Sequence, residues 1–179
     1  MGKPGVPTDE GTRDMTDTDP DAAGAPTGSV LVTGPAPERF ERATELVTDE
    51  VVVVPGVDDR LDESLATADA DVAVVPESGG AEPLSELGIS VSDRVARRSE
   101  PDVLVSGDAL ADAGSVCPFT LFRFLHLLRW RVAGTGGRLV CTLGDAVDPI
   151  TIETIDEVFD ERVRLESIRD RRNVGGLSP

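Results

Sequence analysis

Lysine is almost absent from this chain of 179 residues, in which Lys3 stands beside 16 arginines. Schiff-base chemistry needs a lysine amine, and a phosphate-accepting receiver domain needs a lysine near its acidic pocket. Lys3 lies in a stretch rich in Pro, Gly, Thr and Asp that has almost nothing to bury against a core. We therefore expect neither activity, and we name no catalytic residue.

Metal-binding and disulfide-forming residues are also scarce. The chain has two cysteines, Cys117 and Cys141, and one histidine, His126. These are too few for a disulfide framework or a four-ligand zinc site, so we expect no metal and no cofactor. The cysteines indicate a reduced intracellular compartment. Each is interpreted as a small apolar residue, with a redox pair as the alternative.

Long hydrophobic runs are missing. No apolar stretch approaches the roughly 18 residues that a membrane helix needs. Charges and prolines occupy the N-terminal region, where a signal peptide would have its apolar centre. We therefore expect a cytoplasmic protein that is neither exported nor anchored in a membrane.

Acidic residues are in large excess. The chain has 34 Asp and Glu against 17 Lys and Arg, a net charge of -17. This charge repels nucleic-acid phosphates and anionic lipid headgroups, so we expect no nucleic-acid or membrane partner. A very acidic, lysine-poor surface keeps a protein hydrated where salt screens its self-repulsion. The composition therefore predicts a halophilic protein.

Composition divides the chain into one domain and two tails. Residues 1–28 are rich in Pro, Gly, Thr and Asp without apolar periodicity, which predicts a disordered acidic tail. Residues 170–179 contain Arg171, Arg172, Gly175 and Gly176 and are predicted to form a flexible C-terminal tail. Residues 29–169 are then the folded domain, a size that supports one core.

Within this domain, short apolar runs alternate with helical stretches, which is typical of βαβ units and a mainly parallel sheet. Strands are predicted at residues 29–33, 51–54, 71–75, 102–106, 138–142 and 162–166. Helices are predicted at 37–48, 61–68, 92–98, 118–132 and 149–159, and a loop at 76–89. The last strand alternates apolar and charged residues, so it should lie at a sheet edge. The fold class is α/β, a RecA-like or P-loop NTPase-like sheet with helices on both faces.

Proline marks the start of three predicted helices. Pro37, Pro118 and Pro149 each lie where a first helical position is expected. Asp148 precedes the last of them and has the side chain of a good N-cap.

The segment after the first predicted strand has the position of a phosphate-binding loop. Residues 30–33 lead directly into Gly34 and a helix follows. A working loop has the form G-x-x-x-x-G-K-[ST], in which lysine reaches the β- and γ-phosphates and the hydroxyl holds magnesium. Counted from Gly34, the last three places hold Arg39, Phe40 and Glu41. We interpret these residues as a degenerate nucleotide loop.

Charged neighbours do not restore the loop. Arg39 or Arg42 supplies positive charge, but a planar guanidinium is a poor substitute for the compact ammonium of lysine. Glu38 and Glu41 lie in the first helical turn, where they favour the helix dipole and repel a phosphate.

Three further residues are weighed as catalytic or metal-binding candidates. Asp108 follows the fourth predicted strand, displaced from the strand tip where a magnesium-orienting aspartate is expected. With Asp112 it could form a metal site, but turn and capping roles are favoured. Ser78 does not lie in a nucleophile elbow, and the sole histidine lies on a predicted helix, so a hydrolase triad has no support.

The predicted helix 118–132 holds three of the five phenylalanines, the only tryptophan and the only histidine. At about 100° per residue, one stripe should face the sheet: Leu121, Phe124, Leu125, Leu128 and Val132. On the other side, residues at i, i+4, i+7 and i+11 form a second row, Phe119, Arg123, His126 and Trp130. Aromatic residues and arginine are typical of interface hot spots. The alternatives are a partner-binding surface and a row covered by the same chain.

The second half of the chain resembles a known family. The resemblance rests on Phe-Arg-Phe-Leu-His within residues 120–165, the Ala-Gly-Thr-Gly-Gly turn, the Cys-Thr-Leu strand, Asp148-Pro149, and the segment from Phe159-Asp160 to Leu165. These features resemble the C-terminal half of haloarchaeal transducer-like (HTR-like) proteins, which are similar to KaiC- and RecA-type ATPases implicated in signal transduction.

The resemblance implies a RecA-like parallel sheet, self-association and a role in signalling or regulation. Residues 34–46 would be the counterpart of the phosphate-loop segment. The ATPase residues do not carry over, because the loop lysine and hydroxyl places hold Phe40 and Glu41, and the strand-tip aspartate falls at Gly107 or Ser106.

Three functions follow as hypotheses. The favoured one is a non-catalytic regulatory or signalling module that binds a protein partner or a second copy through the row Phe119 to Trp130. The alternatives are an NTP-binding ATPase with an unorthodox loop and a decayed paralogue with little retained function.

Overall fold

The computed structural model describes residues 28–36, 38–48, 50–54, 71–73, 83–112 and 116–166. Within them, six strands form one parallel sheet in the order β3-β2-β4-β5-β1-β6. The strands are β1 (Val30–Thr33), β2 (Val51–Val54), β3 (Asp71–Val72), β4 (Asp102–Ser106), β5 (Leu139–Leu143) and β6 (Glu161–Arg164). The helices are α1 (Glu38–Glu45), α3 (Pro83–Val95), α4 (Gly107–Asp112), α5 (Pro118–Ala133) and α6 (Pro149–Asp156).

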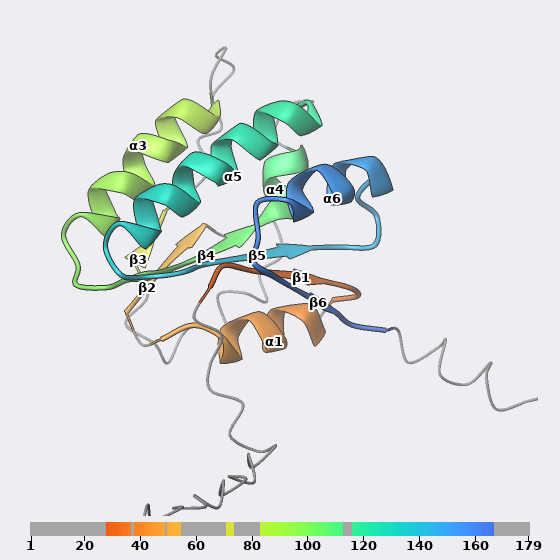
Figure 1. The fold of residues 1–179 in the computed structure, drawn as a ribbon, viewed down its shortest axis with the longest axis horizontal. Coiled ribbons are helices and arrows are strands. Elements are labelled where there is room, and N and C mark those ends of the chain that lie inside the picture. Colours follow the sequence, from red (N-terminus) through yellow and green to blue (C-terminus); the bar gives the residue numbers. More distant parts are fainter. Residues whose placement is uncertain are drawn as a thin grey trace, which may run out of the picture.

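The helices cover the sheet on both faces. Figure 1 shows α1 below the sheet and α3, α4, α5 and α6 above it. α5 packs between α3 and α6. The predicted α/β architecture, with a parallel sheet between helical layers, is confirmed.

Two apolar clusters fill the spaces between these layers, and the alternation along each strand separates them. In β1, Val30 and Val32 belong to the cluster around Phe40 of α1, whereas Leu31 belongs to the cluster beneath α3, α5 and α6. Because β1, β2, β4 and β5 are buried on both faces, their sequences are near-continuous apolar runs.

The alternating strand lies at an edge, as its sequence predicts. β6 pairs with β1 alone among the described strands, and three of its four residues are exposed. Its charged residues protect an open edge from pairing with another chain.

Most predicted elements are found, with ends shifted by a few residues. β2 and β4 have the predicted bounds, β5 begins and ends one residue later, and α1 and α6 end three residues earlier. Pro118 and Pro149 start their helices, and Asp148 accepts the N–H of Thr151 as an N-cap. The predicted helix 61–68, Pro37, and the tails, apart from residue 28, lie outside the described residues.

The prediction for residues 76–98 is partly wrong. Residues 83–89 form the first half of α3 instead of a loop, and the helix ends at Val95 instead of 98. Leu84, Leu87, Val91 and Val95 are buried at i, i+3, i+7 and i+11. A β-carbon at Gly88 would lie 3.5 Å from Phe124 Cε2, so the helix-weakening glycine is placed where α5 packs closely.

The helix α4 was not predicted from the sequence. α4 follows β4 directly at Gly107, where a turn was expected. A β-carbon there would lie 2.8 Å from the carbonyl oxygen of Thr142, so glycine allows α4 to start against β5.

Candidate functional site

The carboxyl ends of β1, β4 and β5 meet at one edge of the sheet, where open parallel sheets bind ligands. Gly34 follows β1, Asp108 lies one residue beyond Gly107 after β4, and Gly144 follows β5. α1 begins four residues after Gly34 and carries Arg39 to the same edge. We call Gly34, Arg39, Asp108 and Gly144 the Arg39 cluster.

Gly34 is required by strand packing. Its φ of 142° is unfavourable for residues with a side chain. A β-carbon at this position would lie 2.7 Å from the carbonyl oxygen of Leu165, and the N–H of Gly34 donates to the Leu143 carbonyl at 3.2 Å. The glycine thus lets β1 end between the chain segments that follow β5 and β6.

Arg39 is buried at the position predicted for a degenerate loop residue. It is 5% exposed, its Nη1 donates to the Gly34 carbonyl at 3.0 Å, and its Nη2 donates to the Asp108 carboxylate. The guanidinium carbon lies 4.6 Å from the ring centre of Phe40, in cation–π range. The positive charge of Arg39 is therefore paired with groups of the protein itself.

Asp108 joins the three strand ends. Its Oδ2 accepts from Arg39, and its Oδ1 accepts the N–H of Gly144 at 2.8 Å. A β-carbon at Gly144 would lie 2.3 Å from Arg39 Nη1 and 3.0 Å from Asp108 Oδ2. Sequence reasoning gave Asp108 a turn or capping role and missed this ion pair across 69 residues of chain.

Polar atoms without partners gather in and around the Arg39 cluster. Among the described residues, four buried side-chain atoms lack a hydrogen bond, namely Thr33 Oγ1, Glu38 Oε2, Arg39 Nε and Thr142 Oγ1. The two threonines lie at the carboxyl ends of β1 and β5, and Glu38 and Arg39 lie in the first turn of α1. Unsatisfied buried groups are rare in proteins, and here all four belong to the elements that form this edge.

The turn after β1 is poorly suited to hold a phosphate. A phosphate loop presents successive backbone N–H groups, but Pro35 and Pro37 have none. Phe40 is 2% exposed in the core beside α1, whereas Glu41 is exposed. The two prolines were a signal in the sequence that the motif comparison did not use.

The predicted row on α5 is exposed. Phe119 is 63% and Trp130 is 79% exposed, and Arg123 and His126 also face solvent. We call these four residues the α5 face. No element in the described part of the chain covers this row.

The opposite stripe packs on the sheet as predicted. Leu121, Leu125, Leu128 and Val132 are buried, while Phe124 is partly buried against the core below α3, α5 and α6. On the α6 side of the helix, the Phe122 ring stacks between Phe119 and His126 with centroid distances of 6.5 and 5.8 Å. The Phe122 ring therefore connects Phe119 and His126 of the α5 face through stacking.

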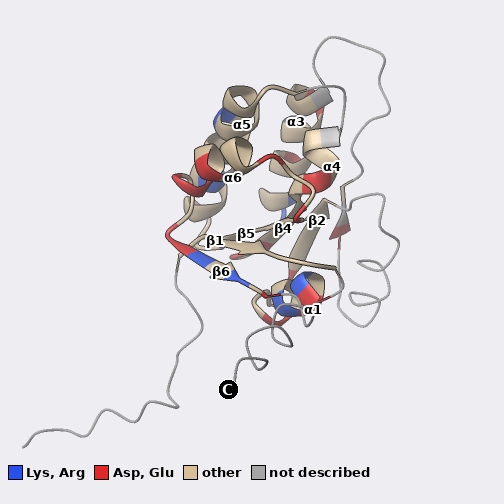
Figure 2. Ribbon diagram, turned by 90° about the vertical axis from the view of Figure 1, so that its right-hand side faces the viewer, with Lys and Arg blue, Asp and Glu red and all other residues tan. Residues whose placement is uncertain are grey.

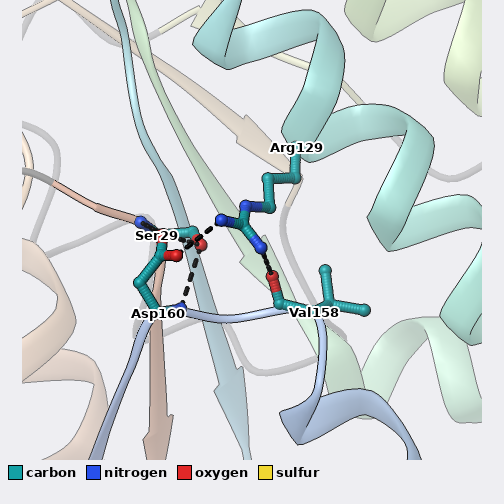
Figure 3. A network of polar contacts seen from close by, with 4 residues as sticks. All are labelled: Ser29, Arg129, Val158 and Asp160. Carbon is teal, nitrogen blue, oxygen red and sulfur yellow. Dashed lines mark hydrogen bonds and ion pairs between the residues drawn. The ribbon is translucent and has the colours of Figure 1, made fainter.

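A polar network ties the end of α5 to the sheet (Figure 3). Arg129 donates to the Val158 carbonyl and to Asp160 Oδ1, and Asp160 Oδ2 accepts both the N–H and the hydroxyl of Ser29 at 2.9 Å. Partial burial opposes ionisation, but the Ser29 hydrogen bonds and the Arg129 charge lower the pKa of Asp160 overall. Arg129 is thus structural, unlike the exposed Arg123.

The two cysteines have different environments. Cys117 is exposed immediately before α5, and its Sγ lies 3.1 Å from the Thr120 hydroxyl, which lowers the thiol pKa. Cys141 is buried in β5, and burial, helped by the Asp108 charge, raises its pKa. Both are free thiols, and the apolar role predicted for each fits only Cys141.

A surface pocket of about 490 Å³ lies away from the Arg39 cluster. Charged side chains dominate its wall, and Arg94 Nε donates to Asp71 Oδ1 at 3.1 Å within it. Sequence reasoning did not predict this pocket, because it placed residues 83–89 in a loop. The lining residues are Asp71, Glu86, Ile89, Ser90, Asp93, Arg94 and Arg97.

The described part of the chain contains neither a metal-binding group of side chains nor a membrane-spanning helix. Within it, no group of three or more His, Cys, Asp and Glu side chains is arranged to hold a metal ion. The Asp112 side chain, the predicted companion of Asp108, and Ser78 lie outside the described residues. Within the same ranges, no helix combines the length and apolar character needed to cross a membrane.

Comparison with known proteins identifies the family. A search of curated proteins finds no match to this sequence. A family model described as "Family of unknown function (DUF7504)" matches residues 7–165, which includes most of the predicted N-terminal tail and both the Arg39 cluster and α5. The match covers well over half of the chain, and the protein therefore belongs to the DUF7504 family.

Proposed function

We propose that the protein is a non-catalytic, RecA- or KaiC-like regulatory or signalling module. In this proposal, the Arg39 cluster replaces a nucleotide site, and the α5 face binds a protein. The resemblance to haloarchaeal transducer-like proteins supports the signalling role, and the parallel sheet with α1 directly after β1 is compatible with a RecA-like origin.

The Arg39–Asp108 ion pair carries this proposal. A triphosphate at the carboxyl ends of β1, β4 and β5 needs free positive charge and open N–H groups. The guanidinium of Arg39 is instead bonded to the Gly34 carbonyl and to Asp108, and Asp108 also takes the N–H of Gly144. A phosphate would have to break the ion pair and displace a partly buried carboxylate that is itself negatively charged.

The surface role rests on exposure. Phe119 and Trp130 are among the most exposed large apolar side chains in the described residues, and they stand at the two ends of a row with Arg123 and His126 between them. Aromatic residues and arginine supply most hot-spot energy in protein interfaces. A row of these types on a folded surface is more useful for binding than for stability.

One alternative has a specific observation in its favour. Arg39 Nε is buried without a partner, and Asp108 lies close to it, so the cluster holds one phosphate-binding and one magnesium-binding side chain. A nucleotide-binding protein with arginine in place of lysine would use these two residues.

Isothermal titration of the full chain with Mg-ATP in molar potassium chloride separates the two functions. We expect no heat of binding for the wild type. Micromolar binding that is lost in Arg39→Ala and retained in the surface control Glu41→Ala would overturn the proposal in favour of the alternative.

The surface role is tested separately with Trp130→Ala and Arg123→Ala. Both variants should keep the wild-type circular dichroism spectrum and unfolding midpoint, because neither side chain is part of the core. Both should lose protein association. Association of both variants at wild-type strength would contradict the assignment of the α5 face.

A further inference from the structure

α5 and α6 lie side by side and carry opposite charge. Residues 118–133 contain three arginines and one histidine but no acidic residue, whereas residues 144–160 contain six acidic residues and no basic one. The two helices are in contact in the layer above the sheet. Figure 2 shows arginine on α5 in blue and acidic residues around α6 in red.

The outer side of α6 also exposes an apolar residue. Ile150 is 67% exposed, and Glu153 and Glu157 are exposed at i+3 and i+7 from it, so the three lie on one side of the helix and the turn that follows it. Ile155, about 140° away from Ile150 around the helix, points into the core. We call Ile150, Glu153 and Glu157 the α6 face.

The two faces complement each other in chemistry. The α5 face offers aromatic rings and Arg123, and the α6 face offers an aliphatic side chain and carboxylates. Within one molecule they point outward side by side and do not meet. A second copy of this surface, turned over, pairs each face with its complement.

We infer that the occupant of the α5 face is a second copy of this chain, which docks through its α6 face. A two-fold axis in the interface, parallel to the two helices and running between them, places α5 of each copy over α6 of the other. Such a contact is isologous and closes at two subunits. The inference rests on the proposed function, because it names the partner of the same α5 face.

The size of the surface indicates a weak, reversible contact. A helix of 16 residues such as α5 is about 24 Å long at about 1.5 Å per residue, and packed helices lie about 10 Å apart. The 8 residues of α6 span about 12 Å, so the two helices together present roughly 360 Å² per copy, or roughly 700 Å² in a dimer, which is the range of weak, transient contacts.

Net charge sets the conditions under which the dimer forms. Each copy carries a charge of -17, so two copies repel each other at low salt. In molar salt the screening length falls to about 3 Å, and only charges in near contact still interact. Burial of the apolar side chains then gives the affinity, and the contacts of Arg123 with acidic residues of α6 select the orientation.

Sedimentation equilibrium of the full chain in molar potassium chloride, over a series of protein concentrations, measures the dimer. We expect a mass that rises from 18.9 kDa toward twice that value. Trp130 is the only tryptophan, so its emission should shift to shorter wavelength over the same concentrations. A wild type that stays at the monomer mass up to its solubility limit would overturn the inference.

Single substitutions locate the contact. Phe119→Ala and Ile150→Ala should each raise the dissociation constant about tenfold or more, as expected for anchors in an interface. Ile89→Ala is the matched control, since Ile89 is 65% exposed on α3, and it should dimerise like the wild type. Equal weakening by the control, or none by Ile150→Ala, contradicts the α5-on-α6 arrangement.

A charge exchange tests the pairing directly. Arg123→Glu alone places acid against acid, and Glu153→Arg alone places base against base, so each variant should be monomeric. An equimolar mixture should form a heterodimer, because each α5 then meets an α6 of opposite charge. A mixture that stays monomeric, or a Glu153→Arg variant that still dimerises, overturns the inference.

Failure of this inference is distinguishable from failure of the proposed function. If the wild type is monomeric but another protein binds it through Trp130 and Arg123, the second copy is excluded and the interaction module stands. If Mg-ATP binds through Arg39, the proposed function fails whatever the mass of the protein.

Discussion

The two ends of β4 each carry a buried ion pair, and the two pairs differ in how completely their polar atoms are bonded. At the amino end, Asp102 is 3% exposed and accepts the N–H groups of Thr48 and Arg138 at 2.9 and 3.0 Å, as well as the Arg138 guanidinium at 3.2 Å. These contacts join the end of the α1 region, β4 and the start of β5. The role of Asp102 at this end is therefore structural, because its hydrogen bonds hold the three segments together.

At the carboxyl end, the bonding is incomplete. The Asp108 side chain is 27% exposed, Arg39 Nε has no partner, and neither does the buried hydroxyl of Thr142 on the neighbouring strand. Parallel sheets hold their ligands at this end. The two ends therefore differ in that the carboxyl end has unpartnered polar atoms beside an ion pair, Arg39 with Asp108, whereas the Asp102 carboxylate at the amino end is fully bonded.

Asp102→Ala should cause the largest loss of stability. It removes a buried carboxylate and leaves the partly buried Arg138 guanidinium and two backbone N–H groups without that partner. We expect a loss of about 3 kcal/mol, typical of breaking a buried pair. Denaturant unfolding in molar salt measures it, with the exposed Asp93→Ala as control. If Asp102→Ala lowers the free energy of unfolding no more than Asp93→Ala does, the amino end is not the more strongly stabilising end of β4.

Asp108→Ala should cost less, about 1.5 kcal/mol, because water can reach the place of a carboxylate that is 27% exposed. Asp108→Asn retains an oxygen for the Gly144 N–H and should cost less than the alanine variant. The same unfolding experiment ranks the three variants. A loss larger than that of Asp102→Ala would show that the ion pair at the carboxyl end contributes more to the free energy of unfolding than the pair at the amino end.

Cys141 reports local opening of the carboxyl end, because it lies in β5 under Gly107 and Asp108. In a Cys117→Ser background, Asp108→Ala should raise the rate of Cys141 alkylation about tenfold beyond the increase explained by its lower global stability. Asp102→Ala should raise the rate only as far as global unfolding predicts. Equal excess rates in the two variants would mean that the two ends open together.

The smallest effect is expected at a third ion pair, between Arg129 and Asp160, which is far more exposed than the pairs at the ends of β4. The folded protein lowers the Asp160 pKa below its ordinary value of 3.8. Its contribution is therefore fully present above pH 3.8 and is lost as pH falls through the lowered pKa. With the side chain 48% exposed, Asp160→Asn should cost less than about 1 kcal/mol.

The measurement is the unfolding free energy of Asp160→Asn and wild type at neutral pH and at pH values below the ordinary pKa. The difference between them should shrink with falling pH, because the wild-type carboxylate becomes protonated. A difference that is constant with pH would show that ionised Asp160 adds nothing to stability.

Much of the architecture was predictable because it depends on short-range patterns. Continuous valine and leucine runs predicted β2 and β4 with correct bounds, and Pro118 and Pro149 marked two helix starts. The helical spacing of Leu121, Leu125, Leu128 and Val132 likewise predicted which side of α5 is buried. The first half of α3 was missed because Gly88 lowers helix propensity, and the burial of Leu84 and Leu87 against the core offsets this.

By itself, the sequence determined the parallel α/β class, the edge position of β6, the absence of lysine from residues 34–41 and the composition of the α5 face. Each of these depends on residue type or on spacing along the chain. The tertiary structure alone decided that Arg39 pairs with Asp108, that Gly144 leaves room for the pair, and that α5 lies beside an acidic α6. The physical reason is that such contacts join segments far apart in the chain, and their geometry exists only once the strand order has brought those segments together.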